Sequence, residues 1–264
     1  MSTWIDQIPA AARTYIENNR LDEVECVIAD LPGIARGKAV PAAKWERQTS
    51  FHLPNSIFYQ TITGDWGEAA EDGFTEPDMI LKPDLATTTA APWASDGTLQ
   101  VIHDAFDLKG KPIGCAPRNV LKRVVDLYKK EGWTPVVAPE MEFYLVDDSG
   151  IELRQPKSPR SGKRRPGAEI LSLRALDAFD AFFNDLYDGC EAMDIPTEAA
   201  TSEVGLGQFE INLVHVDDAL KAADDAYFFK MLVRGLARKH GMAASFMAKP
   251  YADYAGSGMH VHFS

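Results

Sequence analysis

The sequence predicts an α+β fold, because its first hundred residues have the pattern of short strands and turns, whereas the rest alternates long helices with strands. The change falls near Pro117, where a helical pattern that starts with proline follows a region rich in Gly, Pro, Asp and Thr. A chain of 264 residues with 45% hydrophobic content can bury the cores of two domains. We therefore expect a β-rich domain over 1–113 and a domain of antiparallel strands with flanking helices over 114–264.

The expected first domain begins with a helix over residues 3–20, where apolar and polar positions alternate at helical spacing. Two β-rich runs over residues 21–45 then flank Leu31-Pro32-Gly33, which is a hairpin signal. Residues 48–95 lack strong periodicity and predict extended chain and turns.

The expected second domain begins with an amphipathic helix over 117–133 and a β-branched and aromatic strand over 134–148. The same alternation continues to the end of the sequence. We expect helices over 172–194 and 216–241, and strands near 197–203, 208–215, 242–250 and 258–264.

The formal net charge of −12 disfavours nucleic acid as a partner, because phosphate neutralisation needs clustered Lys and Arg. One basic run, residues 154–167, lies among Pro, Ser and Gly and predicts a mobile, solvated loop; the alternative is a role near anionic ligands. Its cations are Arg154, Lys157, Arg160, Lys163, Arg164 and Arg165.

Cysteine usage and the apolar pattern favour a cytoplasmic protein. Cys26, Cys115 and Cys190 form an odd, widely spaced set, which disfavours a disulfide framework and a zinc knuckle and suits a reducing compartment. The first residues have no apolar core of signal-peptide length, and no later stretch reaches membrane-spanning length. We expect no membrane partner.

Three strand-like segments carry side chains that can bind metal. Glu140 and Glu142 are two residues apart, as are His260 and His262, so each pair faces one side of a strand. Glu203 and Glu210 flank the glycine-bearing turn 205–207, which can return the chain so that both acids meet one cavity. Each pattern alone is more often a solvated sheet face. Together they favour a cation, because clustered buried carboxylates are costly without one.

The donor types indicate which cation to expect. Oxygen-dominated ligands with one or two histidines favour Mg²⁺ or Mn²⁺ over zinc. Paired hard cations suit phosphoryl transfer from a nucleotide. The sequence has no Walker-type glycine loop with lysine, so metal and scattered side chains would hold ATP.

These segments resemble the glutamine synthetase family in the order that the family has them. The similar segments are "ADLPGIARGKAVP", "KPDLATTTAAPWA", "PRNVLKRV", "APEMEFYL", "EVGLGQFEINL" and "FMAKPYADYAGSGMHVHFS". The resemblance covers nearly the whole chain and implies a small β-grasp domain followed by part of a glutamine-synthetase-type catalytic domain. It also implies an ATP-dependent ligase that joins the γ-carboxyl of glutamate to an amine through an acyl phosphate.

The resemblance implies a role for each matching position. One metal would be held by Glu142, Glu203 and Glu210, and the nucleotide-bridging metal by Glu140 and His260. Glu198, His262 and Ser264 match nucleotide contacts, and Gly256 matches a glycine that contacts substrate glutamate. No residue is assigned as a catalytic acid or base.

Two departures from the family pattern concern the amine. The stretch "SIFYQTITGDWGE" lacks the Asp-Gly-Ser-Ser of many ammonia-using members, and Ala255 replaces an asparagine before Gly-Ser-Gly. Both changes resemble the γ-glutamylpolyamine (γ-glutamylputrescine) synthetase branch. Tyr59, Trp66 and Phe74 lie in or near the stretch "SIFYQTITGDWGE", which would face the amine pocket of an adjacent subunit. Aromatic residues of this kind more often pack in the core.

Family chains continue well beyond the His260–His262 strand, so we expect an N-terminal portion that is inactive alone, from a protein that forms a homo-oligomer. Three alternatives stay open: an ammonia-using glutamine synthetase, a truncated non-catalytic member of the family, and an unrelated metal hydrolase that uses the same carboxylates.

Overall fold

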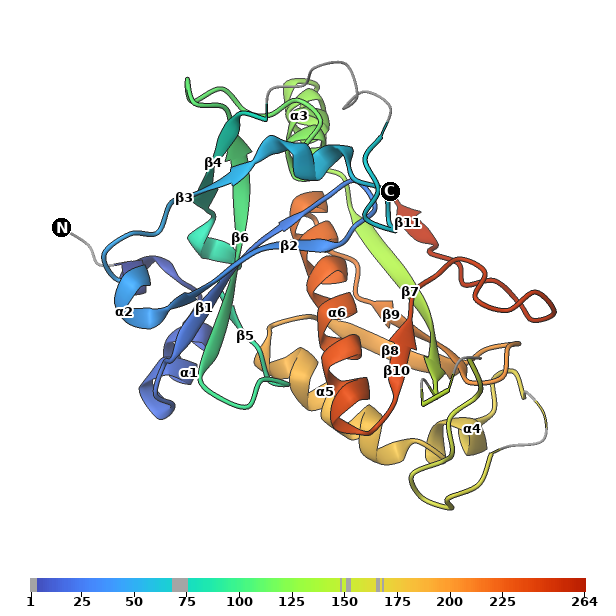
Figure 1. The fold of residues 1–264 in the computed structure, drawn as a ribbon. Helices are drawn as coiled ribbons and strands as arrows, with labels where there is room; N and C mark the ends of the chain where they lie inside the picture. Colours follow the sequence, from blue (N-terminus) through green and yellow to red (C-terminus); the bar gives the residue numbers. More distant parts are fainter. Residues whose placement is uncertain (1–3, 68–75, 148, 151–152, 165–166, 168) are drawn as a thin grey trace. The chain divides into compact units, whose positions relative to one another are not determined.

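The computed structural model describes residues 4–67, 76–147, 149–150, 153–164, 167 and 169–264. It forms two compact units, Met1–Trp133 and Thr134–Ser264, and each combines a sheet with helices (Figure 1). The predicted α+β class is confirmed.

The division after Trp133 lies later in the chain than the expected border at 113/114, because helix α3 (Pro117–Lys130) is bonded to the first unit. The Asn119 side chain donates to the Ala105 carbonyl at 2.8 Å. Arg118 forms ion pairs with Asp84 at 2.8 Å and with Asp104 at 2.7 Å. Helix α3 is therefore anchored to the sheet that precedes it, and the domain bounds 1–113 and 114–264 stay a prediction.

The first unit contains a mixed sheet of order β2-β1-β6-β4-β3, with β5 also paired to β6. Strands β1 and β2 are the predicted hairpin, with Gly33 at φ 75° in its turn, and β1 pairs with β6 in parallel. The strands are β1 (Glu23–Ala29), β2 (Ala35–Pro41), β3 (Phe51–Pro54), β4 (Asp78–Pro83), β5 (Thr89–Ala90) and β6 (Thr98–Phe106).

Short helices accompany this sheet. The helix predicted over residues 3–20 is instead two pieces, η1 (Trp4–Gln7) and α1 (Ala10–Asn18), because Pro9 has an extended ψ of 153° between them. The others are α2 (Ala42–Trp45), η2 (Asn55–Tyr59) and η4 (Leu85–Thr87). Trp45 is fully buried against Phe51, Leu99 and neighbouring aliphatic side chains.

The second unit contains an antiparallel sheet of order β10-β7-β9-β8, with β11 also paired to β7. Its strands are β7 (Val137–Val146), β8 (Thr197–Ser202), β9 (Gln208–Leu213), β10 (Ala243–Ser245) and β11 (Val261–Phe263). The predicted strands are all present, and β10 and β11 are shorter than expected. Long strand β7 is the centre of the unit, since three other strands pair with it.

Helices α4 (Leu173–Asp177), α5 (Asp180–Ala192) and α6 (Ala219–Lys239) accompany this sheet, and α6 packs on β7 and β10 (Figure 1). The core between them is aromatic: Phe143 of β7 lies 6.3 Å, between ring centroids, from each of Phe182, Phe209 and Phe229. Burial of these rings fixes which face of β7 and β9 is covered by helices.

The helix predicted over 172–194 is broken between α4 and α5. Phe179 is buried and has a non-helical backbone with φ −125°, and the Ala178 carbonyl accepts from the Ser158 hydroxyl at 2.7 Å. A side chain from a distant loop therefore satisfies a backbone group that the break leaves without a helical partner.

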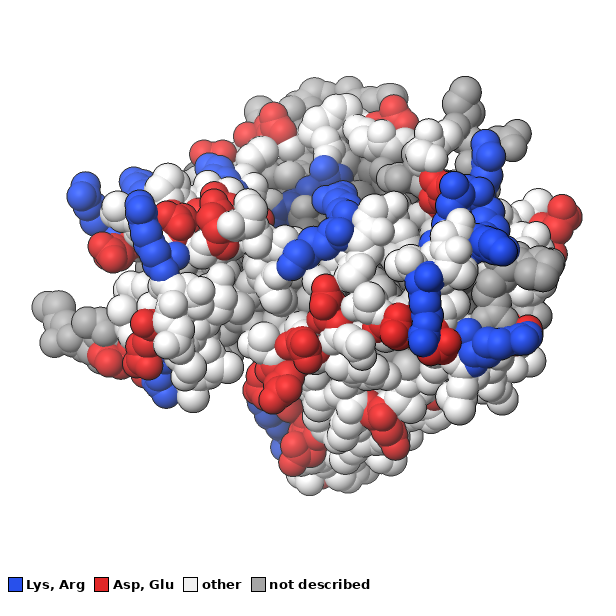
Figure 2. All heavy atoms as spheres, turned by 90° about the horizontal axis from the view of Figure 1, so that it is seen from below, with Lys and Arg blue, Asp and Glu red and all other residues white. Residues whose placement is uncertain are grey.

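Two cations of the basic run form ion pairs with acids. Arg160 pairs with Asp177 and Arg164 with Asp147. Figure 2 shows Lys and Arg side chains in small groups, with Asp and Glu among them, on the face that it draws. Within the described ranges, no helix is both long and apolar enough to cross a membrane.

Candidate functional site

Three cross-strand pairs on the polar face of β7 and β9 form the candidate site. Met141, Phe143 and Leu145 are buried on the helix-covered face, so the residues between them point to the other face. The register aligns Glu140 with Asn212, Glu142 with Glu210, and Tyr144 with Gln208. The sheet thus places two carboxylates directly opposite each other, with an amide-bearing pair on either side.

Glu140 is held by His262 of β11 and by His260, which directly precedes that strand. His262 Nε2 lies 2.8 Å from Oε1 of Glu140, and His260 Nδ1 lies 3.1 Å from Oε2. The backbone amide of Glu140 donates to the His260 carbonyl at 2.9 Å, which aligns β11 beside β7. The hydrogen bond with His262 lowers the pKa of Glu140, although burial opposes it. Glu140 is therefore ionised at neutral pH.

Glu210 lies next to this group. Asn212 Nδ2 donates to Oε1 of Glu140 at 3.0 Å and to Oε1 of Glu210 at 3.2 Å, so one amide bridges both carboxylates. One ligand atom from each of Glu140, Glu210 and His260 lies within 4.8 Å of the other two. Burial raises the pKa of Glu210, and the negative charge of Glu140 raises it further. A cation at this cluster would relieve that repulsion.

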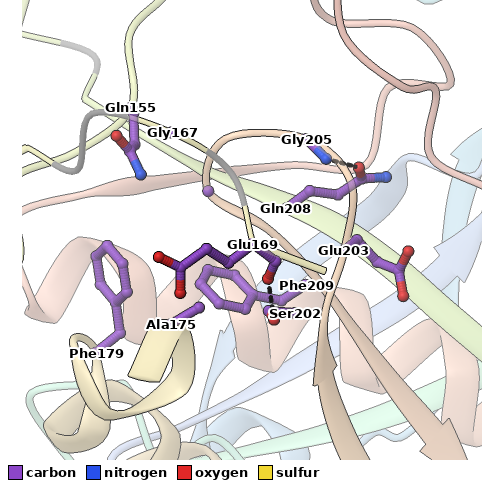
Figure 3. Close-up of a pocket in the computed structure, with 11 residues that line it drawn as sticks. Gln155, Gly167, Glu169, Ala175, Phe179, Ser202, Glu203, Gly205, Gln208 and Phe209 are labelled. Carbon is purple, nitrogen blue, oxygen red and sulfur yellow. Dashed lines mark hydrogen bonds between the residues drawn. The ribbon is translucent and has the colours of Figure 1, made fainter. Parts of the chain in front are cut away.

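Glu203 lies near these carboxylates, at the turn between β8 and β9. The Glu203 amide donates to the Gln208 carbonyl at 2.9 Å, and Gly207 has φ 79° with no room for a side chain beside the Leu145 carbonyl. The turn returns the chain as the glycines indicated. Burial, followed by the charge of Glu142, raises the pKa of Glu203. In Figure 3 its carboxylate points away from Glu169, the other acid of the small cavity behind the turn.

A glycine-rich loop between β10 and β11 completes the site. A Cβ on Gly258 would lie 2.7 Å from Oε1 of Glu142, and one on Gly256 would lie 2.7 Å from the Ala248 carbonyl oxygen. The Ser257 amide donates to that same carbonyl at 2.9 Å. The loop therefore runs directly against the carboxylate face, and it does so because glycine leaves the necessary space.

The remaining predicted residues have different surroundings. Glu198 lies at a bulge in β8 and is exposed. The backbone of Ser264 pairs with Val136, at 2.9 and 3.0 Å. Tyr59 and Trp66 belong to the first unit, and half of the Trp66 surface is exposed; Phe74 lies outside the described residues.

Sequence reasoning missed Tyr144, Gln208 and Asn212, which hold the carboxylates and the loop. The signal was present, because each lies two residues from a predicted glutamate on the same strand and so shares its face. Their roles depend on register, which aligns residues far apart in the sequence.

The donor set fits Mg²⁺ or Mn²⁺. Four carboxylates and an imidazole are the hard, oxygen-rich ligands that these ions prefer. Burial and neighbouring carboxylates raise the pKa of Glu203 and Glu210, and a cation would offset both effects. The polar face of the sheet thus presents a set of donors that suits a hard divalent cation.

The family follows from comparison with known proteins. The family model "Glutamine synthetase, catalytic domain" matches residues 114–264, so this chain belongs to the glutamine synthetase family. The resemblance predicted from the motifs is confirmed.

Individual relatives agree with this assignment. The chain is 38% identical over 247 residues to Gamma-glutamylputrescine synthetase PuuA of Escherichia coli (strain K12), covering 91% of this chain and 52% of the relative. It is 33% identical over 260 residues to Glutamate--isopropylamine ligase of Pseudomonas sp, covering 96% and 56%. A solved structure described as a novel glutamine synthase homolog matches with a TM-score of 0.79 at 25% identity, covering 92% and 55%. The chain spans about half the length of these relatives.

Proposed function

We propose that this chain carries part of the site of an ATP-dependent ligase that joins the γ-carboxyl of glutamate to an amine, with Mg²⁺ or Mn²⁺. The observation that carries the proposal is the cluster of Glu140, Glu210 and His260, whose ligand atoms lie within 4.8 Å of one another beside Glu142 and Glu203. Family membership supplies the class of reaction.

In this proposal Glu142, Glu203 and Glu210 hold one cation, and Glu140 with His260 holds the other. The cations would neutralise the charge of the phosphates and of the reacting carboxylate. His262, Glu198 and Ser264 are proposed to contact ATP, and Gly256 to contact glutamate.

The proposed reaction has two steps. An oxygen of the glutamate γ-carboxylate attacks the γ-phosphorus of ATP, and ADP leaves. The amine nitrogen then attacks the γ-carbonyl carbon of the resulting γ-glutamyl phosphate; inorganic phosphate leaves and the nitrogen loses a proton. Oriented donors at the carboxylate face would hold the reacting groups together, which lowers the barrier of both steps.

We propose an organic amine or polyamine as the acceptor. Two observations support it: Ala255 lies where an asparagine is common, and the two relatives above are named for putrescine and isopropylamine. The alternatives are ammonia as the acceptor and a non-catalytic protein. Because family sites lie between subunits, we also propose a homo-oligomer, which light scattering after gel filtration would detect.

The metal site can be tested on this chain. Glu210→Gln keeps the shape of the side chain but removes one negative charge, so Mn²⁺ binding measured by calorimetry should weaken about tenfold or more. Glu191→Gln, at an exposed position of α5, removes the same charge away from the site and should bind Mn²⁺ like the wild type. Equal affinity in all three proteins would refute the proposed site.

A further inference from the structure

We propose that Tyr144 and Gln208 are positioning residues that hold the Ala255–Gly256 segment against the carboxylate face and couple its position to the orientation of Glu142. This inference rests on the proposed function, since it concerns how the same site is kept in order.

The two side chains bind successive carbonyls of the glycine-rich loop. The Tyr144 hydroxyl donates to the Ala255 carbonyl at 2.5 Å, and Gln208 Nε2 donates to the Gly256 carbonyl at 3.0 Å. Tyr144 and Gln208 are themselves register partners on β7 and β9. One cross-strand pair therefore holds two consecutive peptide groups of a loop that lies far away in the sequence.

Burial and hydrogen bonds restrict the orientation of the Tyr144 and Gln208 side chains. Tyr144 is fully buried and Gln208 is 2% exposed. The Gly205 amide donates to Oε1 of Gln208 at 2.9 Å (Figure 3), which directs the amide nitrogen of Gln208 toward its two acceptors.

The surrounding residues are shaped around this pair. A Cβ on Gly205 would lie 2.0 Å from the Tyr144 hydroxyl and 2.7 Å from Oε1 of Gln208, so only glycine fits there. On the loop side, the Tyr251 ring packs on Tyr144 at 5.3 Å between centroids, and Tyr254 packs on Tyr251 at 5.4 Å. The loop is thus fixed by packing as well as by hydrogen bonds.

Gln208 also links the loop to a proposed metal ligand. Its Nε2 donates to Oε2 of Glu142 at 2.8 Å while it donates to the Gly256 carbonyl. The other oxygen of Glu142 lies where a Cβ on Gly258 would be only 2.7 Å away. Because one amide binds both groups, loss of the Gln208 amide would free the Gly256 carbonyl and the Glu142 carboxylate together.

Two variants separate the two contacts of this pair. Tyr144→Phe removes only the bond to the loop, so hydrogen exchange of amides 251–258 should become about tenfold faster. Mn²⁺ affinity should stay within about twofold, because Glu142 keeps its donor. Gln208→Met removes the bonds to Gly256 and Glu142, and also the acceptor of the Gly205 amide, at similar volume, so exchange in the loop should rise similarly and Mn²⁺ affinity should fall about tenfold. Gln100→Met, at a buried glutamine of the first unit, is the matched control and should change neither readout.

The outcomes show whether Tyr144 and Gln208 position the loop or only stabilise the fold as a whole. A faster exchange confined to 251–258, with weaker Mn²⁺ binding only in Gln208→Met, supports the inference. Unchanged loop exchange in both variants overturns it, and so does an equal loss of protection throughout α5, α6 and the loop. If the wild-type chain fails to bind Mn²⁺, the proposed function fails, while loop exchange still tests the positioning role.

Discussion

Among single residues, the polar groups of the second unit differ in how their charge is compensated. Glu140 lies within 3.1 Å of two imidazoles, whereas Glu203 and Glu210 accept hydrogen bonds from neutral groups and have other carboxylates nearby. Charges that are buried without a partner are costly, and proteins tolerate them where a ligand supplies the partner. This asymmetry is what distinguishes the cluster from an ordinary solvated acidic face.

A different buried acid, Asp225 of α6, should make the stability of the protein depend on pH. It is 7% exposed, and burial raises its pKa from 3.8 to about 6, although Lys221 Nζ at 2.9 Å opposes the shift. The folded state therefore binds this proton more tightly than the unfolded chain does. Its contribution to stability is fully present below pH 3.8 and is lost as pH rises to about 6.

The substitution Asp225→Asn should remove this pH dependence, because the amide stays neutral. Between pH 4 and 7, the free energy of unfolding of the variant relative to wild type should rise by up to about 3 kcal/mol. Urea denaturation followed by circular dichroism at 222 nm measures it. Asp217→Asn, at an exposed position, is the control. A constant difference between variant and wild type across that range would contradict the prediction.

Strand periodicity was sufficient to place Glu140 with Glu142 and His260 with His262, because a period of two needs no knowledge of neighbours. Periodicity could not predict which glutamate contacts which histidine. The contact between His262 and Glu140 joins residues 122 positions apart, and it depends on β11 pairing with β7 in one register. Asn212 and Gln208 escaped notice for the same reason.

At the scale of elements, the sequence predicted helices and strands better than their interruptions. The order of elements from 117 onward agrees with the structure, since apolar periodicity is a local signal. The break between α4 and α5 is not local: it depends on Ser158 reaching the Ala178 carbonyl and on burial of Phe179. Tertiary contacts of this kind override helix propensity and leave no mark in the periodicity.

The start of α6 allows a test of one local sequence signal, the N-cap aspartate. Asp218 is the N-cap, and its Oδ1 accepts from the amides of Leu220 at 2.9 Å and Lys221 at 3.1 Å. Asp218→Ala leaves both amides without this acceptor, so the free energy of unfolding should fall by about 1 kcal/mol. Urea denaturation measures the loss.

Asp217, which directly precedes the N-cap Asp218, provides a matched control. Asp217→Ala removes the same charge one residue before the cap, at an exposed position, so it should change the free energy of unfolding by less than about 0.5 kcal/mol. Equal losses in the two variants would mean that charge near the helix end, and not the cap itself, stabilises α6.

At the scale of the whole molecule, the acceptor is the property that the chain's own residues constrain least. Ala255 contributes a methyl group where the family resemblance implies an asparagine, and its carbonyl accepts a hydrogen bond from Tyr144. The same loop presents Tyr254, which is 40% exposed and offers aromatic surface. Such a surface gains about 0.8 kcal/mol for each methylene that it buries, whereas ammonia has none to bury.

We therefore expect a protein of the relatives' full length that carries this sequence to prefer alkylamines to ammonia. The measurement is a competition assay with ATP, glutamate and Mg²⁺ that compares ammonia, putrescine, ethanolamine and simple alkylamines by kcat/KM. If apolar contact provides the preference, kcat/KM should rise with chain length by up to about fourfold per methylene until the pocket is filled. Ala255→Asn restores the amide at the same position and should shift the preference toward ammonia. A highest kcat/KM for ammonia with the unaltered sequence would instead make this protein an ordinary glutamine synthetase, and the Ala255 substitution would then have no bearing on the acceptor.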